Sequence, residues 1–444
     1  MENLLTEKVK PLYLKYLSAA FGSALISSIY GLVDMAMVGQ YQGPDGTAAL
    51  AVVAPVWNVI YSLGLLTGIG GSVIFSMKRG MDGGKKGNEN EYFTSSVILS
   101  VILAVLSTLA LFLFEDGILT FFGADEVLLP LAKDYLRPIK YVFPLFLFNQ
   151  ALAAFLRNDN SPSLATAAVL SGGIFNVFGD WFFVFPCDMG LYGAGLATAM
   201  GSVGSFVIMI THFFRKRCTL RLEKPQRPLH QAKRIAVTGF STFFIDVAMG
   251  ILTILFNKQI MHYLGSAALS VYGPIINVST FVQCSAYSVG QASQPIISTN
   301  YGAGNGARIK ETLKYSIITT FIFAVFWTAL SEAVPNLYIH IFMNPTDEVL
   351  EIAPAIIRMY SVSFMLLPFN IFSTYYFQAI MKSRTSMAVS VMRGLVISGA
   401  LILTLPVFLP ASSIWMSMPV TELITAIYVA SMMKKYTAAL PVSE

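Results

Sequence analysis

The chain has 444 residues, of which 55% are hydrophobic and only 12% are charged. Soluble domains carry about 25% charged residues, so this composition argues against an ordinary soluble fold and indicates a protein embedded in lipid. The net charge of +5 does not predict a nucleic-acid partner, because Lys and Arg fall in short segments between apolar stretches. Three scattered cysteines argue against a disulfide framework or a thiolate metal site.

Apolar stretches long enough to cross a bilayer recur along the whole chain. A span needs roughly 20 residues, and the sequence predicts twelve of them. We place these spans at residues 12–38, 48–77, 92–114, 131–156, 162–185, 191–214, 232–262, 266–299, 312–333, 348–381, 387–409 and 412–433. The expected fold class is therefore an all-α integral membrane protein with twelve transmembrane helices.

The basic residues predict the orientation of these spans. Most of the 29 Lys and Arg lie at the two termini and in alternate loops, on one side of the membrane. The positive-inside rule places this side, and therefore both termini, in the cytoplasm. We expect an N-terminal six-helix lobe at residues 1–214, a cytoplasmic linker rich in charge and proline at 215–231, and a C-terminal six-helix lobe at 232–444.

The two halves of the chain repeat one another. Residues 48–58 read AALAVVAPVWN and residues 267–277 read AALSVYGPIIN. Further along, and with a slip of two positions, Asn149 matches Asn370. Parallel repeats of this size are typical of secondary transporters, which hold their substrate near the bilayer midplane between the two copies. Transport is therefore the first hypothesis.

Three carboxylates fall inside predicted spans: Asp34, Asp180 and Asp246, with Glu422 as a weaker fourth. A charged carboxylate in hydrocarbon costs at least ~2.5 kcal/mol, so these residues need polar partners or a wet cavity. Asp180 lies near the end of its span, and the alternative for it is a solvated position among the lipid headgroups. If the acids are instead buried among the helices, they predict a functional site.

Two of these acids have a polar residue one helical turn away. Asn176 precedes Asp180 by four positions, and Tyr30 precedes Asp34 by four, so each pair shares a helix face. A carboxylate removed from water can bind a proton. The same oxygens suit Na⁺, a hard cation that prefers carboxylate, amide and hydroxyl ligands. Both ions remain open at this point.

The eighth span carries a series of polar residues that includes Asn277 and Gln283, which lipid-facing helices avoid. We expect this series to line a wet interior together with Tyr272. Aromatic side chains beside acids suit flat cationic substrates. The glycine run at 64–71 predicts close helix packing or a hinge. The four histidines are scattered and indicate neither a metal site nor a catalytic triad, so we expect no enzyme activity.

Several segments resemble the multidrug and toxic compound extrusion family, and within it the bacterial DinF- and MepA-like branch. The segments that carry this resemblance are VDMAMVGQYQGPDGTAALA at 33–51, FNVFGDWFFVF at 175–185, YGAGLATAMG at 192–201, VGQASQPIISTNYGAGN at 289–305 and YYFQAIMKS at 375–383. The resemblance implies two six-helix lobes around a central cleft. It also implies export of varied, often cationic compounds in exchange for H⁺ or Na⁺.

Matching positions carry the family's coupling residues onto this chain. The resemblance implies that Asp34, Asn176, Asp180 and Thr198 form the ion-coupling cluster, which could hold Na⁺. It places Tyr30 and Asn149 in the same cavity. In the second lobe, Asp246 stands near a glutamate of some branches, whereas the acid that those branches carry in the tenth helix has no counterpart among residues 357–381. Coupling is therefore expected in the first lobe.

The sequence as a whole predicts a plasma-membrane exporter that alternates between outward-open and inward-open shapes. We expect no cofactor other than the coupling ion, small organic substrates, contact with membrane lipid and a monomer. A flippase for lipid-linked oligosaccharide is an alternative of similar architecture, but it needs cationic side chains facing its cavity, and few are present. A channel or a membrane receptor is the alternative from a different class.

Overall fold

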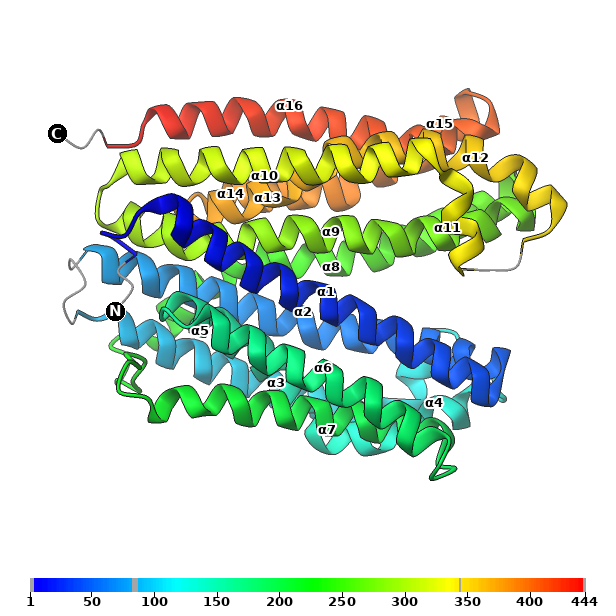
Figure 1. Cartoon of the computed structure of the whole chain (residues 1–444), viewed down its shortest axis with the longest axis horizontal. Helices are drawn as coiled ribbons and strands as arrows, with labels where there is room; N and C mark the ends of the chain where they lie inside the picture. The colour runs from blue at the N-terminus through cyan, green and yellow to red at the C-terminus, as the bar shows by residue number, and fades with distance from the viewer. Residues whose placement is uncertain (1–3, 82–86, 343–344, 442–444) are drawn as a thin grey trace. The chain divides into compact units, whose positions relative to one another are not determined.

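The computed structural model describes residues 4–81, 87–342 and 345–441 (Figure 1). Every regular element within these ranges is helical, and twelve helical segments are long and apolar enough to cross a membrane. This confirms the all-α membrane fold that hydropathy predicts. Helices are the expected outcome, because in lipid every backbone polar group needs a partner within its own segment.

The first half of the chain supplies six of the twelve spans. They are formed by α1 (Val9–Gln42), α2 (Pro44–Met81), α3 (Glu89–Phe121), α4 (Leu128–Ile139) followed by α5 (Phe143–Asn158), α6 (Pro162–Val184) and α7 (Gly190–Ile210). The span made by α4 and α5 is broken at residues 140–142, just before Pro144, where a short 3-10 turn interrupts the α-helix. Proline explains the break, because it lacks the N–H that the helix would use.

The second half supplies the other six spans. They are formed by α8 (Pro228–Tyr263), α9 (Gly265–Gly302), α10 (Gly306–Ala333), α12 (Asp347–Ser361) followed by α13 (Leu367–Ala379), α14 (Ser383–Val391) followed by α15 (Ile397–Phe408), and α16 (Ser417–Ala438). A short helix, α11 (Pro335–Phe342), connects α10 to α12. A π-helical turn at residues 392–396 joins α14 to α15.

The chain divides into two compact units. Unit 1 consists of Met1–Glu7 and Ser18–Phe243, and unit 2 of Lys8–Leu17 and Phe244–Glu444. We call them the first and second lobe. The beginning of α1 therefore belongs to the second lobe, and the first half of α8 belongs to the first lobe.

Small residues bring the helices of the first lobe into close contact. Within this lobe α6 packs along α7, and α2 packs along α5 (Figure 1). A Cβ atom on Gly64 would lie 2.6 Å from the carbonyl oxygen of Leu147, and one on Gly172 would lie 2.7 Å from that of Gly201. Neither position has room for a side chain. Gly64 belongs to the glycine run in α2, and this run therefore serves close helix packing.

The segment between α7 and α8 is fixed to the first lobe by buried side chains of α3. Asn90 accepts a hydrogen bond from the backbone N–H of Arg221 at 3.0 Å and donates one to the carbonyl of Thr219 at 3.2 Å. Glu91 accepts from the backbone N–H of Gln226 at 3.1 Å. Residues 219–226 of the predicted linker are therefore bound to the helix bundle, because their backbone groups form hydrogen bonds with side chains of α3.

Candidate functional site

The predicted coupling residues of the first lobe form one connected network. Tyr135 on α4 donates a hydrogen bond of 2.7 Å to Asp34 Oδ2 on α1. Its hydroxyl lies 3.5 Å from Thr198 Oγ1 on α7. Three helices therefore meet at this tyrosine, and the acid of α1 points toward the interior of the lobe. Asp34 is only 8% exposed, so its carboxylate does not face the lipid.

The network continues onto α6. Asn176 Nδ2 donates to Thr198 Oγ1 at 2.9 Å and lies 3.4 Å from Asp180 Oδ1. Asp180 is fully buried, so the alternative of a solvated headgroup position does not apply to it. The helical spacing of four residues places the amide and the acid on one face, as expected. Asp34 and Asp180 are close enough to interact electrostatically.

Several oxygens of this network are left without a donor. Among the described residues, Asp34 Oδ1, Asn176 Oδ1 and Asp180 Oδ2 are buried and have no hydrogen-bond partner. Buried polar atoms are almost always paired, and leaving one unpaired costs about 1–3 kcal/mol. Unpaired carboxylate and amide oxygens within one hydrogen-bonded network are ligands suited to a proton or a hard cation such as Na⁺.

A cavity of about 60 Å³ adjoins this network within the first lobe. Asn176 and Thr198 are part of its wall, together with Tyr30 and Asn149. The hydroxyl of Tyr30 lies 2.9 Å from that of Tyr61, which also lines the cavity. The four predicted first-lobe residues on this wall therefore lie beside one polar space. That space is large enough for one or two waters or a small ion.

The predicted residues of the second lobe are more dispersed. Tyr272 and Gln283 line a separate cavity of about 40 Å³ within that lobe. Asp246 accepts a hydrogen bond of 3.1 Å from Tyr287, whose hydroxyl also lies 3.4 Å from Gln283 Oε1. Asn277 lines neither of these two cavities. The structure thus gathers the expected residues of the first lobe beside one cavity, whereas in the second lobe it connects Asp246 to Gln283 through Tyr287 and leaves Asn277 outside this group.

Two tyrosines of the first-lobe site are not predicted by the sequence pattern. Tyr135 bridges Asp34 to Thr198, and Tyr61 pairs with Tyr30. Tyrosine is common in membrane helices as an interfacial or packing residue, so neither stands out by composition. A signal for Tyr135 exists in its register, because it shares a buried face with Ala132 and Ile139.

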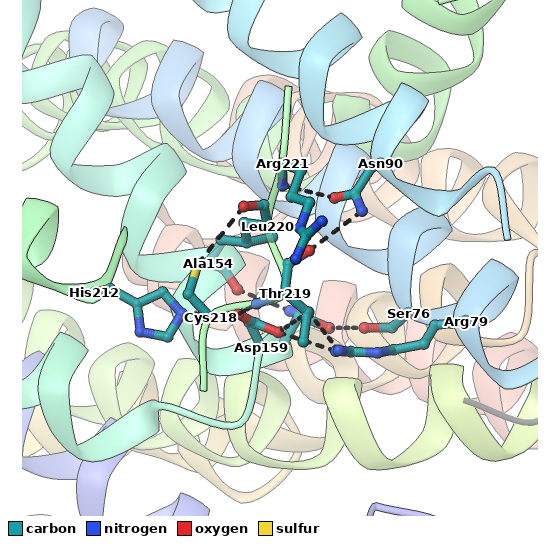
Figure 2. A network of polar contacts seen from close by, with 11 residues as sticks. Ser76, Arg79, Asn90, Ala154, Asp159, His212, Cys218, Thr219, Leu220 and Arg221 are labelled. Atoms are coloured by element: carbon teal, nitrogen blue, oxygen red, sulfur yellow. Dashed lines mark hydrogen bonds and ion pairs between the residues drawn. The ribbon is translucent and has the colours of Figure 1, made fainter. Parts of the chain in front are cut away.

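A second buried polar cluster lies where the chain leaves α7, and Figure 2 shows it. Asp159 accepts hydrogen bonds from Arg79 at 3.1 Å, from His212 Nε2 at 2.7 Å and from the backbone N–H and hydroxyl of Thr219. Burial by itself would raise the pKa of Asp159, but the hydrogen bond from His212, the charge of Arg79 and the bonds from Thr219 together lower this pKa below its ordinary value of 3.8.

One oxygen, one nitrogen and one sulfur atom from Asp159, His212 and Cys218 lie within 4.8 Å of one another. The sequence pattern does not predict this group, because Asp159 lies 53 positions before His212. Both carboxylate oxygens of Asp159 already accept hydrogen bonds, and Cys218 Sγ donates to the carbonyl of Leu220 at 3.6 Å. A metal would have to displace these bonds, so the residues are better suited to an ion-pair network than to a metal centre.

The fold and the first-lobe site together define a class of protein. Twelve membrane spans, two sequence repeats and a buried acid network beside a cavity are the features of a two-lobe secondary transporter. The profile of the MatE family matches the chain twice, at residues 19–182 and 240–403. The chain therefore belongs to the MatE family of multidrug and toxic compound extrusion transporters, as the resemblance in its sequence implied.

Individual relatives agree with this assignment. The chain is 23% identical over 396 residues to the multidrug export protein MepA of Staphylococcus aureus strain MSSA476, covering 88% of this chain and 86% of that protein. It is 26% identical over 410 residues to MepA of Staphylococcus haemolyticus strain JCSC1435, covering 91% and 88%. Both alignments extend over nearly the whole length of both proteins.

Solved structures show the same fold. An outward-facing multidrug resistance MATE family transporter of the MOP superfamily superimposes with a TM-score of 0.90 at 21% identity, covering 98% of each chain. A MOP superfamily transporter from Pyrococcus furiosus, described as having a binding pocket of reversed polarity, superimposes with a TM-score of 0.89 at 20% identity and covers 99% of this chain and 98% of its own. At these identities the likeness concerns the fold.

Proposed function

We propose that the protein is a multidrug efflux transporter that exports small organic compounds in exchange for H⁺ or Na⁺. The observation that carries this proposal is the set of buried carboxylate and amide oxygens without donors, at Asp34, Asn176 and Asp180. A cation bound there would pair these oxygens and neutralise the acids. Buried acids are costly in a membrane-spanning segment. We therefore infer that the function of this site is to bind and release a cation.

Exchange requires that the ion and the substrate favour different conformations of the protein. In this structure Tyr135 on α4 contacts both Asp34 on α1 and Thr198 on α7 and so connects the three helices. A cation that binds the free oxygens of Asp34 and Asp180 neutralises the carboxylate that accepts from Tyr135. It weakens this charge-assisted hydrogen bond and would therefore change how these helices pack. This gives the coupling ion a direct way to favour one shape of the lobe over the other.

The substrates follow from the cavity wall and from the relatives. Tyr30, Tyr61 and Phe146 line the first-lobe cavity, and aromatic faces bind flat organic cations by stacking and cation–π contact. The staphylococcal relatives are multidrug export proteins. We therefore assign small, cationic organic compounds to this chain as substrates. No group in the first-lobe network is arranged as a nucleophile with its base, and transport rather than catalysis is the proposed activity.

The protein is proposed to act as a monomer, with both termini in the cytoplasm, in contact with the lipid of the plasma membrane. The support for the orientation is the distribution of Lys and Arg between the spans. The support for a monomer is that both repeats of the architecture are present in one chain. Cysteine labelling of each terminus in intact cells and cross-linking in native membranes would test the two assignments.

The decisive experiment is efflux of a fluorescent organic cation such as rhodamine 6G from proteoliposomes, with pH and Na⁺ gradients imposed separately. We expect efflux with one of the two gradients, and the responding gradient identifies the ion. The Asp34→Asn variant should lose gradient-driven efflux while eluting as a monodisperse protein. Gradient-driven efflux at the wild-type rate in this variant would overturn the mechanism.

A further inference from the structure

The second lobe contains an ion pair that is buried among its helices. Glu422 on α16 is fully buried, and Arg393 in the π-helical turn is 8% exposed. Arg393 Nε donates to Glu422 Oε1 at 2.7 Å, and Asn370 Nδ2 donates to Glu422 Oε2 at 2.6 Å. Both oxygens of this carboxylate are therefore paired, in contrast to those of the first-lobe acids.

The first lobe makes the same backbone contact at the matching place in its repeat. Asn149, the counterpart of Asn370, donates to the carbonyl oxygen of Ser202 at 3.0 Å. Asn370 donates to the carbonyl oxygen of Glu422 at 2.9 Å. The same amide thus reaches the backbone of the last helix in each lobe. Ser202 and Glu422 therefore occupy corresponding positions, one with a hydroxyl and the other with a carboxylate.

The fifth span of each lobe, which is α6 in the first lobe and α14 with α15 in the second, also differs between the two lobes. The pair Gly172 and Gly173 on α6 corresponds to Arg393 and Gly394, because the separation along the sequence is the one that relates Asn149 to Asn370. A Cβ atom on Gly172 would lie 2.0 Å from Ser205 Oγ, so no side chain fits there. The second lobe has a π-helical turn at this point, and such a turn inserts one residue into the helix.

The two differences, Glu422 in place of Ser202 and Arg393 in place of Gly172, compensate one another in charge. In the first lobe the space between Asn149, Gly172 and Ser202 is part of the open cavity beside the coupling network. In the second lobe the corresponding positions carry one negative and one positive side chain in direct contact. A buried carboxylate needs a counter-charge, and here a residue of the protein itself provides it.

We infer that Arg393 is a built-in counter-ion, which occupies in the second lobe the role that a mobile coupling cation has in the first. This rests on the proposed function, in which the first lobe binds that cation. The consequence is a functional asymmetry between the repeats. The first lobe exchanges cations with the solution, whereas at the Glu422 site of the second lobe the positive charge belongs to an arginine side chain, and this site contributes no cation to the transport stoichiometry.

The test is to remove the arginine and count the cations that bind. The purified full-length protein is studied as wild type, Arg393→Gln, and the matched control Arg393→Gln/Glu422→Gln, in which the acid is removed as well. Bound ²²Na⁺ is measured by scintillation proximity, and bound protons are measured by potentiometric titration. We expect R393Q to bind one monovalent cation more per molecule than the wild type, and the double variant to bind the wild-type number.

The result that would overturn the inference is an R393Q protein with the cation stoichiometry of the wild type. A merely structural ion pair would leave Glu422 of R393Q to take up a proton, because a buried carboxylate without a counter-charge becomes neutral, but it would not create a site for ²²Na⁺ or methylguanidinium. Should R393Q be isolated only when methylguanidinium is added to the buffer, this rescue supports a cation site at Glu422. Failure of every cation to recover R393Q, with the double variant folded, would contradict it.

The Asp34→Asn variant separates this inference from the proposed function. If D34N binds as many cations as the wild type, the first-lobe proposal fails. The additional cation in R393Q can still be counted in the D34N background. If D34N loses its cation and D34N/R393Q regains one, both proposals are supported independently.

Discussion

The hydroxyl of Tyr135 donates a hydrogen bond of 2.7 Å to Asp34 Oδ2, although the two residues are 101 positions apart. This contact ties α4 to the acid of α1 and leaves only the second oxygen of that acid unpaired. Asp34 is therefore held by one hydrogen bond from the protein and can accept a cation on its free side.

Replacing this tyrosine tests the contact directly. Tyr135→Phe removes a hydrogen bond to a charged group, which is worth about 1.5–3 kcal/mol. We expect an approximately 10- to 100-fold change in the ion concentration that gives half-maximal efflux, because 1.4 kcal/mol corresponds to a factor of ten. The matched control is Tyr41→Phe, which removes a 2.6 Å hydrogen bond to Asp188 at an exposed site. Equal effects of the two substitutions would contradict a role for Tyr135.

The network predicts that its members act together. Thr198 accepts from Asn176 and lies next to Tyr135, so Thr198→Val and Tyr135→Phe disturb the same set of bonds. Residues in one network show coupling energies of about 0.5–3 kcal/mol in double-mutant cycles. We expect the ion affinity of the double variant to depart from additivity by this amount. The pair Thr198→Val and Tyr41→Phe should be additive, and strict additivity in both pairs would argue against a connected network.

The cluster around Asp159 predicts how stability depends on pH. Because the pKa of Asp159 in the folded protein lies below its ordinary value of 3.8, the unfolded chain binds more protons in this range. The ionised group therefore stabilises the fold at pH values above 3.8, and this contribution is lost as the pH falls below 3.8. Asp159→Asn should lower the melting temperature by several degrees at pH 7, since breaking a buried pair costs about 3–5 kcal/mol.

The pH series distinguishes this effect from general damage. The difference in melting temperature between wild type and D159N should shrink as the pH falls below 3.8. The control is Asp116→Asn, which removes an exposed ion pair of 2.6 Å with Lys133. Exposed pairs contribute little, so this variant should melt with the wild type. A D159N difference that does not shrink at low pH would refute the assignment.

Close helix contact predicts opposite outcomes for two glycines of one helix. A Cβ atom on Gly239 would lie 1.9 Å from the carbonyl oxygen of Leu66, whereas Gly250 has no atom within 4 Å of such a position. Gly239→Ala should destabilise by about 1–3 kcal/mol through overpacking. Gly250→Ala should stabilise by up to about 1 kcal/mol, because alanine favours the helix. Thermal melting of both variants checks this, and shifts of the same sign would disagree with the packing of α2 against α8.

Hydropathy and repetition were enough to predict the architecture. Each span is a local property, because lipid requires about 20 apolar residues whatever their neighbours are. The repeat is also visible in the chain itself, through segments such as 48–58 and 267–277. The acids stood out for the same reason, since Asp34 and Asp180 are costly anywhere within a span. The helical spacing of Asn176 and Asp180 added one pair of neighbours.

Tertiary structure decided which partners these residues have. Tyr135 reaches Asp34, Asn370 reaches Glu422, and Thr219 reaches Asp159 only because the helices adopt particular rotations and depths. Those rotations depend on packing among all six helices of a lobe, including positions such as Gly172 where no side chain fits. Hydropathy contains no information on them, because it depends on the identity of residues and not on the direction in which each side chain points.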